Sequence, residues 1–316
     1  MSAASATTTL SRAALGAVGV GAACLAYAGL VEVRAFTLRR VQVPVLPPGS
    51  EPVRVLHVSD LHLTPSSRER QAWVAGLAAL EPDLVIDTGD NLAHPDAVPY
   101  VLQSLGRLLE VPGVYVWGSN DYVAPTFKNP LSYLRRPSEP HRLNQAELPW
   151  PDLDAGFRRA GWTNLTHVRT TLEIRGVRIG FRGTDDGHLG RARYEEVAGP
   201  VDRDAVDVSL AVTHAPYLRL LDAMATDGLD LIVAGHTHGG QVCIPGYGAL
   251  VTNCDLDTRR VKGLSQHTAG GHTSWLHVSA GLGTSPYAPL RFACRPEATL
   301  LTLTARPDAG ATPAMG

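Results

Sequence analysis

The residues best suited to chemistry in this sequence are aspartates, asparagines and histidines that occur in short clusters. Each cluster directly follows an apolar run: Asp60-Leu61-His62, Gly89-Asp90-Asn91, Gly118-Ser119-Asn120-Asp121, His214 and Gly235-His236-Thr237-His238. Carboxylates supply charge and can bridge two ions, while neutral imidazoles favour Mn, Fe or Zn over Mg or Ca. The set therefore predicts a site for two divalent metal ions.

The elements that must position these donors are short strands. The apolar runs before the clusters lie at 53–59, 84–88, 114–117, 210–213 and 231–234. Helical patterns at 68–80 and 98–109 separate the first three runs, as is typical of βαβ crossovers. Ligands of an open α/β sheet bind beyond the carboxyl ends of its strands, so the five clusters are expected to converge.

The rest of the chain predicts a second sheet. Residues 170–183 alternate apolar and polar side chains around Arg175-Gly176, which indicates a β-hairpin, and 275–280 and 298–304 are also strand-like. Residues 122–151 form an irregular insertion, interpreted as a lid or substrate surface. We predict that the tail, residues 307–316, is disordered.

Composition excludes several classes of protein. The chain has 316 residues, 44% hydrophobic and 18% charged, with a formal net charge of -2. This balance does not suit a disordered chain or a nucleic-acid-binding protein, and we expect no nucleic-acid partner. The four cysteines contain no C-x-x-C pair, so neither a zinc ribbon nor a thioredoxin motif is present. No feature of the sequence predicts a protein partner.

The N-terminal segment is apolar enough to enter a membrane. No charge occurs from Ala13 to Val31, a length of about 28 Å as a helix, which matches a bilayer core. Residues 1–33 are therefore predicted to be a tail and a single span. Because Ala26-Tyr27-Ala28 has the small-x-small pattern of a cleavage site, a cleaved signal peptide is the alternative. Residues 34–52, which include a proline-rich stretch, are predicted to be a linker.

Charges flanking the apolar segment bear on topology. Arg12 precedes it, whereas Arg34, Arg39 and Arg40 follow it. The positive-inside rule then places the large domain in the cytoplasm, whereas an export signal would show the opposite bias. We predict membrane association and leave the side of the membrane open.

The clusters, together with Gly183-Thr184-Asp185-Asp186 and the run GHTHGGQ at 235–241, resemble the motifs of the calcineurin-like metallophosphoesterase superfamily. The extended GHTHGGQ run, with Gly183-Thr184-Asp185-Asp186 upstream and the N-terminal apolar segment, makes the chain similar to the bacterial membrane-associated YkuE/YaeI-type branch. The resemblance extends over about residues 54–304. It implies an α/β fold over 53–306, a four-layer α/β/β/α sandwich of two mixed sheets with an N-terminal transmembrane or signal helix.

The resemblance also implies roles for individual residues. One ion is held by Asp60, His62 and His238, and Asp90 bridges the two ions. The second ion is held by His214, His236 and an asparagine. The implied enzyme is a phosphodiesterase or phosphomonoesterase that breaks a P–O bond through a metal-bridging hydroxide, without a protein nucleophile. Asp121 is a candidate to orient an imidazole.

The third motif departs from the superfamily's usual Gly-Asn-His-Asp. Without gaps, Ser119 falls on the ligand position and Asn120 on the histidine, whereas a small loop shift returns Asn120 to the metal. A serine hydroxyl is a poor ligand, so we favour Asn120. In either alignment the histidine is absent, and an asparagine cannot deliver a proton. The catalytic candidates are Asp90, Asn120 and Asp121, and a membrane-tethered metal-binding protein with weak or no hydrolase activity is the alternative function.

The substrate itself is not indicated by any motif. Basic residues of the insertion, above all Arg135 and Arg136, are predicted to bind an anionic head group, with a solvated charged loop as the alternative. A membrane anchor favours a lipid or cell-envelope phosphate ester, and nucleotides stay possible substrates. The H-x-H-x-D-H cluster of metallo-β-lactamase-type hydrolases is absent.

Overall fold

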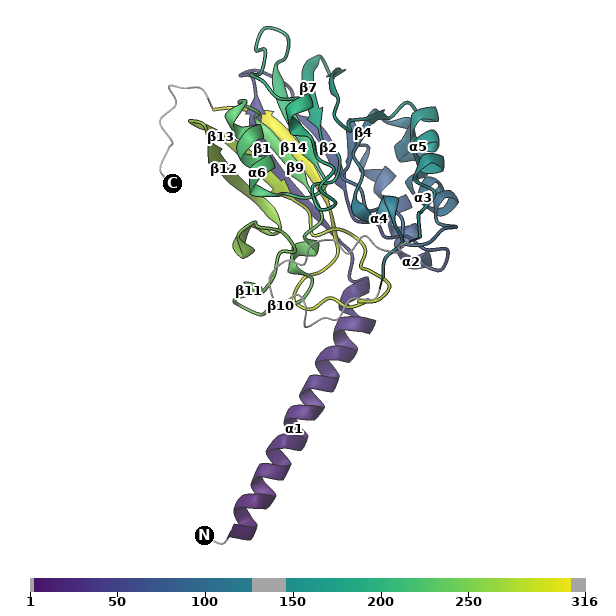
Figure 1. Cartoon of the computed structure of the whole chain (residues 1–316), viewed down its shortest axis with the longest axis vertical. Coiled ribbons are helices and arrows are strands. Elements are labelled where there is room, and N and C mark those ends of the chain that lie inside the picture. The colour runs from purple at the N-terminus through teal and green to yellow at the C-terminus, as the bar shows by residue number, and fades with distance from the viewer. Residues whose placement is uncertain (1–2, 127–145, 308–316) are drawn as a thin grey trace.

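The computed structural model describes residues 3–126 and 146–307, with side chains from Leu15 onward. A six-stranded mixed sheet forms one half of the domain, with strand order β1-β14-β2-β3-β4-β5 (Figure 1). Strands β2 to β5 are parallel, and β14 runs antiparallel to β2. The strands are β1 (Thr37–Leu46), β2 (Val53–Val58), β3 (Leu84–Asp87), β4 (Gly113–Tyr115), β5 (Thr163–Asn164) and β14 (Glu297–Ala305).

A second six-stranded mixed sheet has the order β12-β13-β9-β8-β7-β6. Its strands are β6 (Arg169–Ile174), β7 (Val177–Gly183), β8 (Val208–Thr213), β9 (Leu231–Ala234), β12 (Gly263–Ala269) and β13 (His272–Val278). The four central strands are parallel, and the edge strands β6 and β12 are antiparallel to their neighbours. The predicted hairpin is β6–β7, in which Arg175 and Gly176 both have positive φ.

The two sheets pack face to face through a fully buried apolar core. Ile86 and Leu301 of the first sheet meet Phe181 and Val233 of the second in one cluster. Because the central strands are buried on both faces, their sequences are continuous apolar runs. This pattern made their positions predictable from the sequence. Helices α2 (Arg68–Gly76), α3 (Val98–Leu105) and α5 (Trp150–Arg159) cover the first sheet, and α6 (Leu218–Thr226) covers the second. The four-layer α/β/β/α sandwich is confirmed.

The predicted linker over 34–52 is wrong, because Thr37–Leu46 forms strand β1 at the edge of the first sheet. It pairs in parallel with β14, about 260 residues later in the chain, with Thr37 opposite Glu297. Val43 and Val45 are buried, and Pro44 is tolerated because an edge strand has one unpaired side. The domain therefore begins at β1.

Helix α1 (Ala3–Leu30) is continuous and projects from one end of the domain (Figure 1). By length and composition, 15–34 could cross a membrane, and most of it is exposed. The remaining short elements are α4 (Ser119–Tyr122), β10 (Cys243–Ile244), β11 (Gly248–Ala249), and 3₁₀ helices at Glu32–Arg34, Leu77–Leu80, Gly106–Glu110, Tyr194–Glu196, His238–Gly240 and Thr258–Arg260. The central part of the predicted insertion, 127–145, and the end of the tail, 308–316, lie outside the described residues.

Candidate metal centre

The five predicted clusters converge where the parallel strands of both sheets end. Asp60 and His62 follow β2, Asp90 follows β3, and Asn120 follows β4, all in the first sheet. The remaining histidines follow β8 and β9 of the second sheet: His214, His236 and His238. Five of these ligand candidates have positive φ: Asp60, His62, Asp90, His236 and His238. Such backbone strain in non-glycine residues concentrates at functional sites.

One half of the site holds a compact group of four donors. Ligand atoms of Asp60, His62, Asp90 and His238 all lie within 4.8 Å of one another. Nε2 of His62 is 3.3 Å from Nε2 of His238, and the latter is 3.5 Å from Oδ1 of Asp60. Oδ1 of Asp60 is buried and has no hydrogen-bond partner in the described structure. A cation at the centre of this group would satisfy that oxygen, so the residues fit a metal ion.

The other half of the site lies across Asp90. Nε2 of His214 is 3.2 Å from Nδ1 of His236 and 3.6 Å from Oδ1 of Asp90. The second oxygen of Asp90, Oδ2, lies 3.5 Å from Nε2 of His62 in the first half. The carboxylate of Asp90 thus stands between two pairs of histidines and presents one oxygen to each.

Asn120 also reaches this carboxylate. Its backbone N–H donates to Oδ1 of Asp90 and its side-chain Nδ2 donates to Oδ2, both at 2.7 Å. The preceding Gly118 has no space for a side chain, because an added Cβ would lie 2.2 Å from Oδ1 of Asp90. A glycine therefore lets the third motif approach the site closely enough to place Asn120 on Asp90.

Asp121 makes different contacts from those predicted. Its buried carboxylate accepts backbone N–H groups of Asp90, Asn91 and Gly118, at 2.8 to 2.9 Å, rather than an imidazole. Burial and the neighbouring Asp90 carboxylate raise the pKa of Asp121 to about 8, although these N–H groups act in the opposite direction. Asp121 therefore positions the loop that carries Asp90, and within 3–126 and 146–307 its hydrogen-bond partners are backbone N–H groups rather than imidazoles.

Backbone carbonyls orient three of the four candidate histidines instead: His214, His236 and His238. Thr88 O lies 2.7 Å from Nδ1 of His214, and Gly283 O lies 3.1 Å from Nδ1 of His238. His236 uses the opposite ring nitrogen for this contact. Its Nε2 lies 3.2 Å from Asn253 O, and its Nδ1 therefore faces the site. Each carbonyl accepts a hydrogen bond from one ring N–H, which leaves the other ring nitrogen unprotonated and able to bind a metal ion.

Three of the four candidate histidines are held in the neutral form that binds metal. Burial, followed by neighbouring positive groups, lowers the pKa values of His62, His236 and His238 well below the usual range. Neutral imidazoles are the form that coordinates metals. His214 differs, because nearby carboxylates, chiefly that of Asp90, outweigh burial and raise its pKa to about 9. A metal ion would have to displace that proton.

Asp60 lies at one end of a series of buried hydrogen bonds that runs through Ser59 and Thr88. The hydroxyl of Ser59 donates to Oδ2 of Asp60 and itself accepts from Thr88 at 2.6 Å. The series continues from Thr88 to Nε2 of His57 at 2.9 Å, and from Nδ1 of His57 to His277 at 3.0 Å. It crosses from the first sheet to the second and fixes the orientation of a ligand.

Two residues near the site were not predicted. The ring of His188 lies 4.7 Å from that of His236, centroid to centroid, and its Nδ1 is 3.1 Å from the Tyr217 hydroxyl. His188 follows strand β7, so the strand-end argument could have found it. Arg70 donates through Nη1 to the carbonyls of Leu61 and His62, both at 2.8 Å. Arg70 lies on a helix, and no spacing in the sequence indicates this contact.

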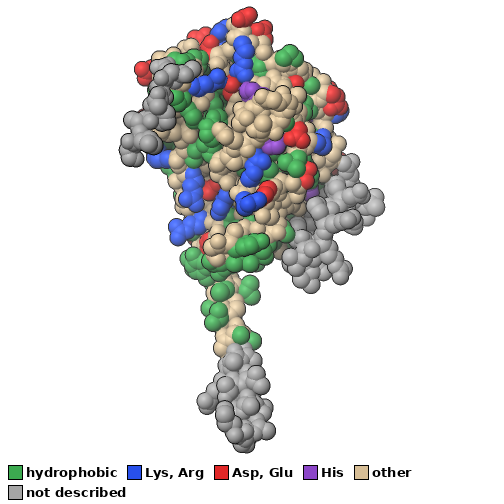
Figure 2. Space-filling view, turned by 90° about the vertical axis from the view of Figure 1, so that its left-hand side faces the viewer, with side chains coloured by type: hydrophobic (Ala, Val, Ile, Leu, Met, Phe, Trp, Pro, Cys, Tyr) green, Lys and Arg blue, Asp and Glu red, His purple; other side chains and the backbone are tan. Residues whose placement is uncertain are grey.

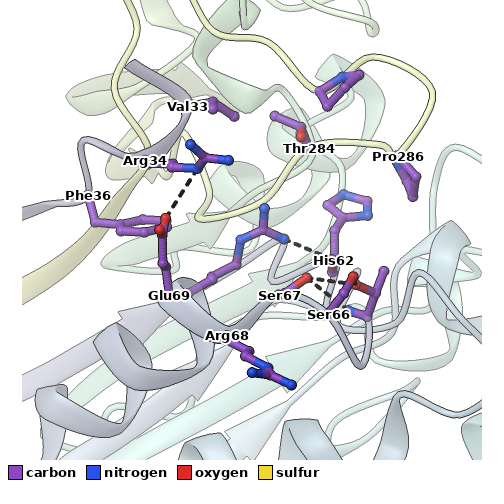
Figure 3. Close-up of a pocket in the computed structure, with 13 residues that line it drawn as sticks. Val33, Arg34, Phe36, His62, Ser66, Ser67, Arg68, Glu69, Thr284 and Pro286 are labelled. Carbon is purple, nitrogen blue, oxygen red and sulfur yellow. Dashed lines mark hydrogen bonds and ion pairs between the residues drawn. The ribbon is translucent and has the colours of Figure 1, made fainter. Parts of the chain in front are cut away.

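A pocket of about 500 Å³ opens beside His62 (Figure 3). Its wall includes Arg70, Ser66 and Ser67 at the start of α2, and Arg34 and Phe36 just after α1. Arg34 is held there by an ion pair with Glu69, with a distance of 3.2 Å from Nε to Oε2. The pocket therefore joins His62 to the end of the domain that carries α1. The predicted substrate residues Arg135 and Arg136 lie outside the described residues and stay a prediction.

Comparison with known proteins agrees with this geometry. A family model described as calcineurin-like phosphoesterase matches residues 53–240. The uncharacterized metallophosphoesterase YkuE of Bacillus subtilis is 27% identical over 279 residues, covering 84% of each chain. Phosphodiesterase YaeI of Escherichia coli is 26% identical over 274 residues, covering 85% of this chain and 88% of its own. A Bos taurus transmembrane protein with metallophosphoesterase domain is 26% identical over 274 residues, covering 84% of this chain and 57% of its own.

The fold and the cluster of metal-binding residues define a metallophosphoesterase, a hydrolase that acts on phosphoric ester bonds. The chain belongs to the calcineurin-like phosphoesterase family. The superfamily and the YkuE/YaeI-type branch predicted from the motifs are confirmed.

Proposed function

We propose that this protein is a membrane-anchored phosphoesterase that uses two divalent metal ions and a hydroxide nucleophile. The observation that carries the dinuclear proposal is the position of Asp90, whose Oδ1 lies 3.6 Å from His214 and whose Oδ2 lies 3.5 Å from His62. A carboxylate shared by two groups of histidines suits a bridge between two ions.

Each half-site then has its own ligands. Asp60, His62 and His238 would hold one ion, and His214, His236 and Asn120 would hold the other, with Asp90 shared. When bound, two divalent ions lower the pKa of water toward neutrality and neutralise charge on the phosphoryl oxygens. The set of aspartate, asparagine and imidazole donors favours Mn, Fe or Zn. Asp121 and Ser59 contribute by holding Asp90 and Asp60 in place.

The chain's own residues supply the rest of the site. Arg70 keeps His62 in position through two backbone carbonyls and lines the adjoining pocket, where its positive charge suits an anionic part of the substrate. Asn120 can donate a hydrogen bond to a phosphoryl oxygen but cannot protonate a leaving group. We therefore propose a phosphate-ester substrate with a good leaving group.

Membrane anchoring is the second part of the proposal. Helix α1 is long, apolar and exposed, and the pocket beside His62 is walled by residues that directly follow it. This arrangement favours a phosphate ester of a lipid or cell-envelope head group. A single span is preferred to a cleaved signal, since Tyr27 and Ala28, which cleavage after Ala28 would remove, contact the domain through the Phe292 ring and the backbone N–H of Arg291.

The test is hydrolysis of bis-p-nitrophenyl phosphate and p-nitrophenyl phosphate by the full chain with Mn, Fe or Zn supplied in turn. Replacing Asp90 with asparagine should lower kcat by about 10³-fold, equivalent to ~4 kcal/mol of transition-state stabilisation. Asp204→Asn, an exposed aspartate far from the strand ends that carry the site, is the matched control. Metal binding without turnover under all conditions would instead support the alternative, a membrane-tethered metal-binding protein.

A further inference from the structure

Exposed apolar side chains of the domain gather at one end. Among described residues after α1 and Val31, six large hydrophobic side chains are exposed, and only Val168 lies elsewhere. The other five belong to the β10–β11 hairpin and a nearby loop, and we call them the apolar rim: Val242, Ile244, Tyr247, Leu250 and Tyr287. Tyr247 is 72% exposed. Figure 2 shows hydrophobic side chains concentrated at the base of the domain, next to α1.

The apolar rim is connected directly to the last turns of α1. Val242 forms a parallel bridge with Phe292, and the Phe292 ring meets the Tyr27 ring edge-on with centroids 6.2 Å apart. The backbone N–H of Arg291 donates to Ala28 O at 3.1 Å. The exposed hairpin therefore lies beside the point at which the apolar helix leaves the domain.

The direction of α1 relative to the apolar rim is fixed by further contacts. The buried carboxylate of Glu32 accepts the backbone N–H groups of Ala293 and Cys294, at 3.0 and 2.6 Å. Arg34 adds its ion pair with Glu69 of α2. Because these contacts hold both sides of the helix exit, insertion of α1 into a bilayer would bring the hairpin to the same level as that exit.

We propose that the apolar rim is a second membrane contact, inserted into the interface of the bilayer that holds α1. This inference rests on the proposed anchoring by α1. Aliphatic side chains accompanied by tyrosine suit the boundary between head groups and acyl chains, where the ring is buried and the hydroxyl stays hydrated. A contiguous apolar surface next to a membrane helix is also costly to leave in water.

The proposed contact would act on the metal centre through short connections. Gln241, just before the hairpin, donates its backbone N–H to His238 O at 2.9 Å. Asn253, just after the hairpin, holds Nε2 of His236 through its carbonyl at 3.2 Å. Both ends of the hairpin thus adjoin predicted metal ligands, and membrane contact would set the site at the level of the lipid head groups.

The test places an environment-sensitive NBD fluorophore at single sites of the full chain in phosphatidylcholine–phosphatidylglycerol vesicles. Test sites are Tyr247→Cys and Ile244→Cys in a Cys24→Ala background, and labelled background protein corrects for the three buried cysteines. Glu173→Cys is the control, because this exposed residue lies near the β6–β7 turn, at the opposite end of β7 from the metal site. Native Cys24 reports insertion of α1 itself. Quenching is measured with lipids that carry a nitroxide at position 5 of the acyl chain.

We expect the labels at 247 and 244 to be quenched about twofold, as the Cys24 label is, and the label at 173 to be unaffected. If the Cys24 label is quenched while those at 247 and 244 match 173, the apolar rim does not contact the membrane although the anchor stands. If the Cys24 label is not quenched either, α1 is not inserted in the bilayer, and the proposed anchoring itself is contradicted. A blue shift at 247 without lipid quenching would indicate a second copy of the chain on the hairpin and would overturn the proposal.

Discussion

The carboxylate of Asp121 accepts the backbone N–H of Asp90 at a distance of 2.8 Å. The same carboxylate accepts N–H groups of Asn91 and Gly118, so it joins the loop after β3 to the loop after β4. Asp90, the residue that would bridge the two ions, is therefore fixed by the hydrogen bond from its backbone N–H to Asp121. Both of its side-chain oxygens stay directed toward the histidines.

Replacing Asp121 with asparagine should destabilise the protein by about 2–3 kcal/mol, because the amide has one acceptor oxygen and turns an N–H toward buried N–H groups. Urea unfolding at pH 9, above the raised pKa of Asp121, where its carboxyl group is ionised, measures the change. Metal affinity should fall in parallel, since the Asp90 loop loses its support. Asp204→Asn is the control for removal of a carboxylate. Wild-type stability with wild-type metal affinity would contradict the positioning role.

Replacing Ser59 with alanine should weaken metal binding by about 10–100-fold, the usual effect of removing a hydrogen bond to a ligand. Ser59 is the link between Asp60 and the chain through Thr88 to His57. Ser104→Ala is a matched control, because Ser104 is also buried and donates to Tyr100 O away from the site. Competition with a chromophoric chelator measures the affinity. Equal losses in both variants would show that the Ser59 link has no specific role.

The metal-free protein should lose stability as the pH rises from 6.5 to 9. His214 has a pKa raised to about 9, and Asp121 one raised to about 8. Both groups bind their protons more tightly in the folded protein than in the unfolded chain. Their contribution to the free energy of unfolding is therefore lost as the pH rises through each folded-state pKa. The lowered pKa values of His62, His236 and His238 act below pH 6.5, outside this window. The hydrogen bond from Cys243 lowers the pKa of Cys294 to about 6, which acts in the opposite direction, but this single thiol is outweighed by His214 and Asp121 together. Urea midpoints measured with a chelator should decrease across the range, and a rise would contradict the assignment.

The enzyme should hydrolyse aryl phosphodiesters far faster than alkyl ones. Asn120 occupies the third motif and cannot protonate a departing alkoxide, whereas general-acid help contributes about 10²- to 10⁴-fold. The comparison of p-nitrophenyl and methyl esters of the same phosphate measures this dependence. Comparable kcat/KM values for the two esters would show that another group supplies the proton.

The parts of the fold that follow from local pattern could be predicted from the sequence. Buried central strands such as β3 and β8 are continuous apolar runs, and the donors that follow them mark the site. Strand β1 was missed because its pairing with β14 depends on residues that are remote in sequence and because Pro44 indicates a break. The fold also shows why the edge position tolerates that proline.

The hydrogen bonds that orient the candidate metal ligands could not be predicted from the sequence, for a related reason. The groups that orient His214, His236 and His238 are backbone carbonyls, which carry no side-chain signature. Asp121 was identified as a supporting residue, but its backbone partners could not be read from the letters. His188 could have been found, because it follows β7 as the other donors follow their strands.

The central claim is that Asp90 bridges two metal ions, and the most direct test is the electron paramagnetic resonance spectrum of the full chain loaded with Mn²⁺. The account predicts two ions per chain and a spin-coupled signal, because one carboxylate presents its oxygens to His214 and His62 at 3.6 and 3.5 Å. A saturating stoichiometry of one, with the six-line spectrum of an isolated ion, would contradict it.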